Sequence, residues 1–263
     1  MKPDTFKRIQ FNTPERRNQI LKLITDKESV TVEYLSKKFN VSLVTVRKDL
    51  KSLEEKGLLY RSYGGAHVRH VVALDTRFSE KQKINSAAKQ RIGKAAADMI
   101  YDGETIILDS GTTTLEIAKN LERKKSLTVL TTSLIIAREL AGNPEIVVLL
   151  TGGWLREQSY SLSGPFAENM VRQLFFDKIF FSADGFDFQT GFASPNLLES
   201  KLTSIMIERS KEIIAVIDST KFGKKSFATI VLPDKIDCLI TDKALQSKYY
   251  NKLKKMNIKL TLV

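Results

Sequence analysis

Short apolar runs alternate with helical patterns along residues 89–263, and this alternation restricts the possible folds more than any other feature of the chain. Runs typical of β-strands occur at 105–108, 127–131, 145–150, 178–182, 212–217, 237–240 and 259–263. Helical patterns occur at 92–100, 113–121, 134–140, 166–175 and 197–209. Such alternation predicts an α/β fold in which helices cover both faces of a mainly parallel sheet. In folds of this kind, ligands bind at the carboxyl ends of the strands.

The polar segment after the first of these strands has the composition of an anion site. It reads Asp109-Ser110-Gly111-Thr112-Thr113-Thr114 and opens a helix. Glycine lets the backbone approach a ligand, while the free amides of a helix N-terminus and the hydroxyl groups attract negative charge. The segment has neither the Gly-Lys-Ser/Thr of a Walker loop nor the glycine spacing of a dinucleotide-binding turn. An ordinary helix cap would need one threonine, so the group favours phosphate.

Four further polar clusters follow predicted strands. They are Thr131-Thr132-Ser133, Thr151-Gly152-Gly153, Ala183-Asp184-Gly185 and the segment 218–223 that contains Lys221. Because parallel strands end at one edge of a sheet, we expect these clusters to converge with residues 109–114 on one rim. Asp109, Asp184 and Glu199, which lies near the start of a helix, could accept hydrogen bonds from sugar hydroxyls. Lys221 could add positive charge against a phosphate.

The first 69 residues show the pattern of a winged helix-turn-helix. One helix is predicted to begin at Thr13, a second at Thr31, and a third after Ser42, which would cap it. The second and third helices are joined by a tight turn at 40–41, which is the signature of a helix-turn-helix. Residues 58–68 then predict two strands joined by a glycine turn, the wing of such a domain.

The third helix has one apolar and one basic face. At about 100° per residue, Val46, Leu50 and Leu53 fall within a narrow stripe. The outward face and its flanks carry Val44, Thr45, Arg47, Lys48 and Lys51. A recognition helix needs this arrangement, because cations reach phosphates, polar groups read base edges and a valine can touch a thymine methyl.

Positive charge is concentrated in the same part of the chain. The formal net charge is +12, and residues 1–70 hold 15 Lys and Arg against 8 Asp and Glu. The remaining residues hold 27 against 22. A basic surface of this kind is expected of a module that binds double-stranded DNA.

The first part of the chain resembles the DeoR family of bacterial sugar-metabolism regulators. The matching residues are Val41-Ser42-x-x-Thr45-Val46-Arg47-Lys48-Asp49-Leu50, Gly57-Leu58 and Tyr63-Gly64-Gly65-Ala66. The resemblance implies that Ser42, Thr45, Arg47 and Lys48 contact operator DNA, with Arg61 and the wing residue Tyr63 assisting. The family usually has Arg in place of Lys48 and often His in place of Tyr63. Lysine keeps the charge but loses the bidentate fork of arginine.

The second part also resembles this family, whose sensor half is similar to ribose phosphate isomerases and glucosamine phosphate deaminases. The matching pieces are Asp109-x-Gly111-Thr112-Thr113-Thr114, Thr151-Gly152-Gly153, Asp184-Gly185, Glu199 and Asp218-x-x-Lys221-Phe222. Together the two resemblances cover residues 14–242. They imply a DNA-binding transcription regulator of a carbohydrate catabolic operon, a repressor rather than an activator, that is controlled by a phosphorylated sugar.

The alternative is a sugar phosphate isomerase or deaminase with an appended DNA-binding domain. The isomerases carry an acid-rich Asp-Gly-Ala-Asp-Glu segment and a Lys-Gly-Gly-Gly turn. This chain has Asp184-Gly185-Phe186-Asp187 and Lys221-Phe222-Gly223 at these places. Isomerisation needs a carboxylate base and a partner that stabilises the enediolate. Because those groups are thinned here, we expect binding without catalysis.

The predicted organisation is a winged helix-turn-helix domain at 1–69, a linker at 70–88 and an α/β effector-binding domain at 89–263. Two-fold operators need two recognition helices, so a homodimer or homotetramer is expected. With one cysteine, Cys238, and two histidines, we expect no disulfide, metal or cofactor. The chain has no apolar run long enough to span a bilayer and no signal peptide at its start, which predicts a cytoplasmic protein without membrane contact.

Overall fold

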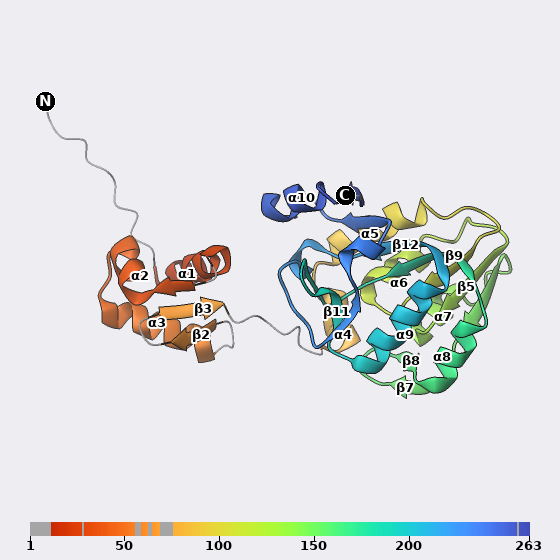
Figure 1. Cartoon of the computed structure of the whole chain (residues 1–263), viewed down its shortest axis with the longest axis horizontal. Helices are drawn as coiled ribbons and strands as arrows, with labels where there is room; N and C mark the ends of the chain where they lie inside the picture. Colours follow the sequence, from red (N-terminus) through yellow and green to blue (C-terminus); the bar gives the residue numbers. More distant parts are fainter. Residues whose placement is uncertain (1–11, 28, 56–58, 63–64, 69–75, 257) are drawn as a thin grey trace, which may run out of the picture. The chain divides into compact units, whose positions relative to one another are not determined.

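The computed structural model describes residues 12–27, 29–55, 59–62, 65–68, 76–256 and 258–263 (Figure 1). The chain divides into two compact units, Met1–Val71 and Val72–Val263. One hydrophobic cluster forms the core of the first unit, and two clusters form the core of the second. Within the described ranges, no helix is both long enough and apolar enough to cross a membrane.

The first unit is a winged helix-turn-helix. Its elements are α1 (Thr13–Lys27), β1 (Ser29–Thr31), α2 (Val32–Phe39), α3 (Leu43–Glu55), β2 (Leu59–Ser62) and β3 (Gly65–Val68). The strands form an antiparallel sheet in the order β1-β3-β2. The three predicted helices and the two wing strands are therefore present. The sequence does not predict β1, because a three-residue strand owes its conformation to pairing with the distant β3.

Side chains at the helix ends explain where α2 and α3 begin. Thr31 Oγ1 accepts the N–H of Tyr34 at 3.1 Å, and Ser42 Oγ accepts the N–H of Thr45 at 3.1 Å. Between the two helices, Asn40 adopts a left-handed conformation with φ of 51°, which asparagine tolerates better than most residues. These three residues set the tight turn of the helix-turn-helix.

The second unit is built on a seven-stranded sheet in the order β15-β14-β12-β9-β4-β5-β6. The strands are β4 (Thr105–Leu108), β5 (Leu127–Thr131), β6 (Ile146–Leu150), β9 (Phe176–Phe181), β12 (Ser210–Val216), β14 (Cys238–Thr241) and β15 (Lys259–Leu262). All neighbouring pairs are parallel. All seven strands predicted from the sequence are present, with small shifts at their ends, and the α/β fold class is confirmed.

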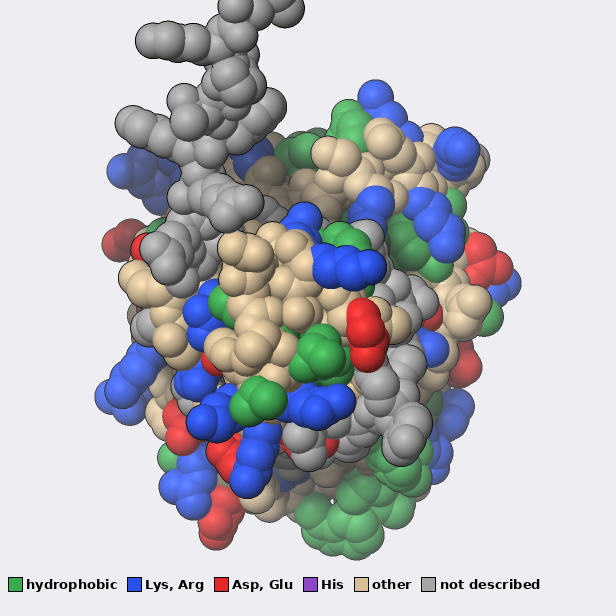
Figure 2. Space-filling view, turned by 90° about the vertical axis from the view of Figure 1, so that its left-hand side faces the viewer, with side chains coloured by type: hydrophobic (Ala, Val, Ile, Leu, Met, Phe, Trp, Pro, Cys, Tyr) green, Lys and Arg blue, Asp and Glu red, His purple; other side chains and the backbone are tan. Residues whose placement is uncertain are grey.

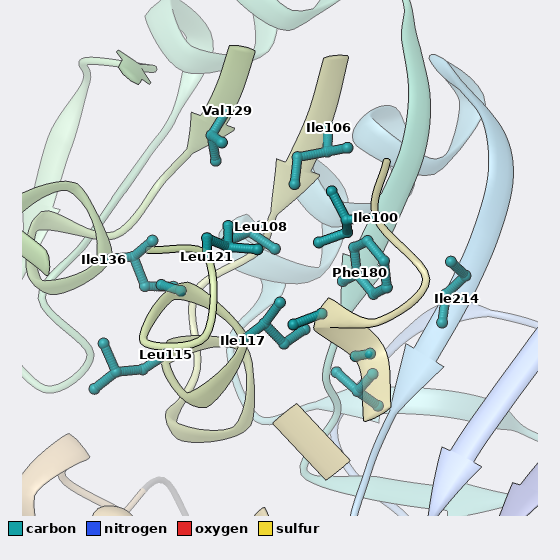
Figure 3. Packing of buried hydrophobic residues seen from close by; sticks show 14 of the residues in the cluster. Ile100, Ile106, Leu108, Leu115, Ile117, Leu121, Val129, Ile136, Phe180 and Ile214 are labelled. Carbon is teal, nitrogen blue, oxygen red and sulfur yellow. The ribbon is translucent and has the colours of Figure 1, made fainter. Parts of the chain in front are cut away.

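Helices cover both faces of this sheet. They are α5 (Ser86–Ala97), α6 (Thr112–Ala118) and α7 (Leu134–Leu140) on one face, and α8 (Pro165–Arg172), α9 (Leu197–Glu208) and α10 (Ser247–Leu253) on the other. Along β4, Ile106 and Leu108 join the first core and Ile107 joins the second, as expected for a strand buried on both sides. Figure 3 shows part of the first core, in which Leu108 and Val129 of the sheet and Ile117 of α6 are labelled.

Two small antiparallel sheets complete the second unit. One is a hairpin of β7 (Trp154–Arg156) and β8 (Ser161–Ser163), and the other contains β10 (Gly185–Asp187), β11 (Gly191–Ser194) and β13 (Ala228–Val231). These two sheets are not predicted from the sequence. They are only three or four residues long, and β11 and β13 are far apart in the sequence.

The segment expected to be a linker, 70–88, partly belongs to the second unit. It contains α4 (Phe78–Lys83) and the start of α5. Phe78 is buried in the first core of the second unit, and its N–H donates to the carbonyl of Gln158 at 2.7 Å. A single buried aromatic residue in a charged segment does not produce a recognisable core pattern, so the sequence of this segment predicts only a linker.

Candidate functional site

The exposed face of α3 carries the predicted DNA-contacting side chains. Val44 is 58% exposed, and Ser42, Arg47, Lys48 and Lys51 are also exposed, whereas Thr45 is half-buried. The opposite face is buried through Val46, Leu50 and Leu53, as the periodicity predicts. Figure 2 looks onto the side of the first unit that carries α2 and α3, and shows Lys and Arg side chains spread over it.

A buried ion-pair network holds α3 against α1. Asp49 is 1% exposed, and its two carboxylate oxygens accept hydrogen bonds from Arg16 Nε at 2.6 Å and Arg17 Nε at 2.8 Å. Arg17 also donates to the hydroxyl of Ser52 at 2.9 Å. The sequence does not predict this network, because a spacing of more than thirty residues between the partners gives no local signal. Asp49 therefore holds α3 against α1 on the side opposite the exposed face of α3.

The wing contributes less to the described surface. Arg61 lies in β2, but its side chain is outside the described part of the structure, and Tyr63 lies outside the described residues altogether. The predicted contributions of these two residues to DNA binding stay predictions.

The second unit contains a pocket at the carboxyl ends of β4 and β9. Eight of the residues predicted to bind an effector line it: Asp109, Ser110, Gly111, Thr112, Thr113, Asp184, Glu199 and Lys221. The polar segments after β4, β9 and β12 therefore do converge, because these three strands are neighbours at the centre of the sheet.

Three lysines and one aspartate form what we call the basic cluster: Lys81, Lys89, Lys221 and Asp184. Lys81 Nζ lies 2.7 and 2.8 Å from the two oxygens of the Asp184 carboxylate, and Lys221 Nζ lies 3.5 Å from one of them. Lys89 Nζ donates to the backbone carbonyl of Lys81. Although burial opposes it, the positive charge of Lys81 and Lys221 holds the pKa of Asp184 below its usual value.

One lysine of the basic cluster, Lys89, is buried and has a low pKa. Burial lowers the pKa of Lys89 to about 8; the charges of Lys221 and Lys81 act in the same direction, and those of Asp218 and Asp184 oppose them. Burial and the charge of Lys221 also lower the pKa of Lys224, which lies three residues after Lys221 in the sequence. A bound anion would favour the charged forms of these lysines, so the cluster is suited to an anionic ligand.

A second group of polar side chains lies around Glu199. Its carboxylate accepts hydrogen bonds from the hydroxyls of Ser159 at 2.5 Å and Ser161 at 2.7 Å, and from Arg156 Nη1 at 3.3 Å. Asn196 caps α9, because its side-chain oxygen accepts the backbone N–H of Glu199 at 3.0 Å. Glu199 is thus held in one place at the wall of the pocket.

Asp109 is buried at the pocket and carries a shifted acidity. Burial raises the pKa of its carboxyl to about 8; the N–H of Ser110 and the hydroxyl of Thr203 oppose this rise, and the charge of Glu199 adds to it. The Ser110 N–H lies 2.7 Å and the Thr203 hydroxyl 3.3 Å from the carboxyl. At neutral pH this group is therefore mainly protonated, and it can donate a hydrogen bond as well as accept one.

Five of the predicted effector-binding residues do not line the pocket: Thr114, Ser133, Gly152, Gly153 and Gly185. The hydroxyl of Thr114 turns back to the carbonyl of Asp109 at 2.6 Å and so stabilises the loop itself. Ser133 caps α7 through the N–H of Ile136. A Cβ on Gly185 would lie 2.4 Å from the carbonyl oxygen of Lys224, which explains the glycine by close packing.

The β7–β8 hairpin explains why the segments after β5 and β6 do not line the pocket. Its backbone pairs with the segment after β5, where the N–H of Leu162 donates to Thr132 and the N–H of Leu134 donates to Tyr160. A Cβ on Gly153 would lie 2.4 Å from the carbonyl oxygen of Ser163 in this hairpin. The hairpin instead places Arg156 and Ser159 at the pocket.

Several pocket residues were not predicted. They include Thr76, Phe78, Lys81, Lys89, Arg156, Gln158, Ser159, Ser182, Ser194 and Thr203. Most of them do not directly follow a strand of the large sheet, so the alternation of strands and helices gives no reason to expect them at a ligand site. Among the described residues, no group of three or more His, Cys, Asp and Glu side chains is arranged to hold a metal ion.

Comparison with known families assigns both units. Residues 16–71 match the DeoR-like helix-turn-helix domain, and residues 84–243 match the DeoR C-terminal sensor domain. The chain belongs to the DeoR family. As a DeoR-family protein it is a DNA-binding transcriptional regulator and not an enzyme, which decides between the two alternatives left open by the sequence.

Full-length relatives agree with this assignment. The HTH-type transcriptional regulator GolR of Listeria innocua is 37% identical over 90% of this chain and 94% of its own length. A putative aga operon transcriptional repressor of Escherichia coli O157:H7 is 35% identical over 95% of this chain and 94% of its own length.

Among solved structures, a D-ribose-5-phosphate isomerase in complex with phospho-erythronic acid is 17% identical over 52% of this chain and 54% of its own length, with a TM-score of 0.40.

Proposed function

We propose that this DeoR-family regulator represses a carbohydrate catabolic operon and is released from its operator when a phosphorylated sugar binds in the pocket of the second unit. The observation that carries the proposal is the basic cluster, where Lys81 and Lys221 pair with Asp184 and Lys89 lines the same pocket beside residues 110–113 at the N-terminal end of α6. Three lysines, one of them buried and two half-buried, favour a ligand with a compact negative charge, such as a phosphate.

The remaining pocket residues suit the sugar part of such an effector. Glu199 can accept hydrogen bonds from hydroxyl groups, and the protonated carboxyl of Asp109 can both donate and accept. Phe78 and Ile230 add apolar surface to the lining. A pocket with charge on one side and hydroxyl partners on the other distinguishes a sugar phosphate from a free sugar and from inorganic phosphate.

On the DNA side, we infer that α3 enters the major groove of the operator. Arg47, Lys48 and Lys51 would contact phosphates or base edges, and Val44 would touch a thymine methyl. Since two-fold operators present two equivalent half-sites, the protein would act as a homodimer or homotetramer. It would do so in the cytoplasm.

A melting-temperature screen tests the effector assignment. Ribose 5-phosphate, glucose 6-phosphate, fructose 6-phosphate and galactosamine 6-phosphate are compared with the same sugars without phosphate and with inorganic phosphate. At least one sugar phosphate should raise the melting temperature and lower operator affinity, while its free sugar should not. No product should form from any of them. Stabilisation by none of the sugar phosphates tested, or by the free sugars alone, would contradict the proposal.

Two sets of variants separate the two binding functions. Arg47→Ala and Lys48→Ala should each weaken binding to a duplex that the wild-type protein selects from a random pool, and leave sugar phosphate stabilisation unchanged. Ser110→Glu places a negative charge at the pocket, so it should abolish that stabilisation and leave DNA binding intact. Ser110→Ala, which adds no charge, is its matched control. Loss of both functions in one variant would argue against this division.

A further inference from the structure

We propose that residues 76–89 sense the occupancy of the pocket, and that Lys81 links a bound anion to this segment. The inference rests on the proposed function, because it concerns how the effector acts on operator binding. The first unit ends at Val71, and α4 begins at Phe78, a few residues further along the chain. This segment is therefore the part of the second unit that follows the DNA-binding unit in sequence.

Four side chains of this segment line the pocket: Thr76, Phe78, Lys81 and Lys89. They line the same cavity as the residues that follow β4, β9 and β12. A ligand large enough to touch the basic cluster is thus contacted by the sheet edge and by residues 76–89 together. The segment is part of the binding site and not only a connection to it.

Besides the packing of Phe78 in the first core, three polar contacts of α4 involve residues of the pocket. The N–H of Phe78 donates to Gln158, and Lys81 is paired with Asp184. Lys89 Nζ donates to the carbonyl of Lys81 near the other end of the helix. Gln158, Asp184 and Lys89 all line the pocket, so an occupant that moves them also moves α4.

The length of α4 makes its position sensitive to these contacts. It spans only six residues, far fewer than the roughly 12–15 at which an isolated helix becomes even marginally stable. Its conformation therefore depends on tertiary contacts. Lys81 and Asp184 are 103 residues apart in the chain, and their ion pair joins α4 to the end of β9.

An anion in the pocket would compete with Asp184 for Lys81. The carboxylate of Asp184 follows a central strand of the sheet, whereas Lys81 extends from a short helix. A phosphate carries up to two charges and several acceptor oxygens, so it can draw the ammonium groups of Lys81 and Lys89 from their present partners. A ligand shifts an equilibrium only if it makes different contacts in the two states, and this exchange of partners supplies the difference.

Lys81→Met tests the inference, with Lys83→Met as its matched control. Lys83 lies on the same helix, is exposed and does not line the pocket. Each protein is saturated with each of the four sugar phosphates of the screen above. Melting temperature reports binding, affinity for the selected duplex reports the response, and amide hydrogen exchange reports the state of residues 76–89.

For the wild type and Lys83→Met, the active sugar phosphate should change operator affinity by about 5- to 150-fold, the usual range of coupling between two sites. Lys81→Met removes one cation of the basic cluster, so it should bind the active sugar phosphate more weakly and need a higher concentration for saturation. Once it is saturated, its operator affinity should nevertheless not change. If it responds like the wild type, the inference is refuted and the proposed function stands. If no sugar phosphate stabilises the wild type, both fail. If Lys81→Met does not bind at all, altered exchange in residues 76–89 of the wild type supports the inference, and unaltered exchange overturns it.

Discussion

Replacing Asp109 with asparagine should make the second unit progressively more stable than the wild type as the pH rises from 5 to 8. Asp109 is buried, and burial raises the pKa of its carboxyl from 3.8 to about 8. Asparagine has nearly the same shape. It can accept the N–H of Ser110 through its amide oxygen and donate to the hydroxyl of Thr203, so the two hydrogen bonds of the wild type survive.

The size of the effect follows from proton linkage. Between pH 3.8 and about 8, the folded carboxyl keeps a proton that the unfolded chain has released. The free energy of unfolding therefore falls by about 1.4 kcal/mol for each pH unit in this window. The protonated carboxyl of Asp109 makes its full contribution to stability below about pH 4, and this contribution is lost as the pH rises through 8. Asparagine does not titrate, so at pH 7 its advantage should reach about 4 kcal/mol as an upper limit.

Urea unfolding at pH 5, 6, 7 and 8 measures this difference. Trp154 is the one tryptophan of the chain and lies in the second unit, so its fluorescence reports on that unit. Asp177→Asn is the control. Asp177 is exposed and accepts hydrogen bonds from the N–H and hydroxyl of Thr105, which lower the pKa of its carboxyl. Its replacement should have the same effect at every pH from 5 to 8.

The reasoning is refuted if the stability of Asp109→Asn runs parallel to that of the wild type across this pH range. A parallel curve would mean that Asp109 is ionised in the folded protein at neutral pH. The pocket would then carry a negative charge, and not a proton donor, next to Glu199.

Three further changes have defined outcomes. Asp49→Ala leaves the buried Arg16 without its partner, which should destabilise the first unit by about 3–5 kcal/mol; circular dichroism melting should show this loss, and sugar phosphate stabilisation of the second unit should persist. Gly164→Ala should lower the free energy of unfolding by about 1–3 kcal/mol and change Trp154 fluorescence, because φ is +97° and the new Cβ would lie 2.9 Å from the indole ring. The control is Gly142→Ala, which has a φ of +94° and open space around it and should leave the fluorescence unchanged. Phe180→Ala should lower the free energy of unfolding by about 3–5 kcal/mol in urea titrations, because the ring is fully buried in the first core; an effect below 1 kcal/mol would contradict that packing.

The large sheet could be predicted from the sequence because its signals are local. A parallel strand buried on both faces is a short apolar run, and each such run in residues 89–263 became a strand. The polar residues that follow β4 and β9 then had to lie at one edge, since both strands run in the same direction and are neighbours. The same reasoning failed for Ser133 and Gly153, because it assumes that nothing covers the ends of β5 and β6.

The recognition helix was likewise visible in the sequence, through its cap at Ser42 and the spacing of Val46, Leu50 and Leu53. The partner that fixes this helix in place was not visible. Asp49 reads as one more polar residue on a charged helix, and only the fold brings Arg16 and Arg17 of α1 to it.

Taken alone, the sequence determined which faces of the helices are buried and which strands end in polar residues, because periodicity and capping depend on neighbours a few positions away. Tertiary structure decided which of those polar residues share a pocket, and it added Lys81, Lys89 and Arg156 to them. The physical reason is distance along the chain. Charged side chains on separate elements meet only after the core has packed, so no local pattern records that they are partners.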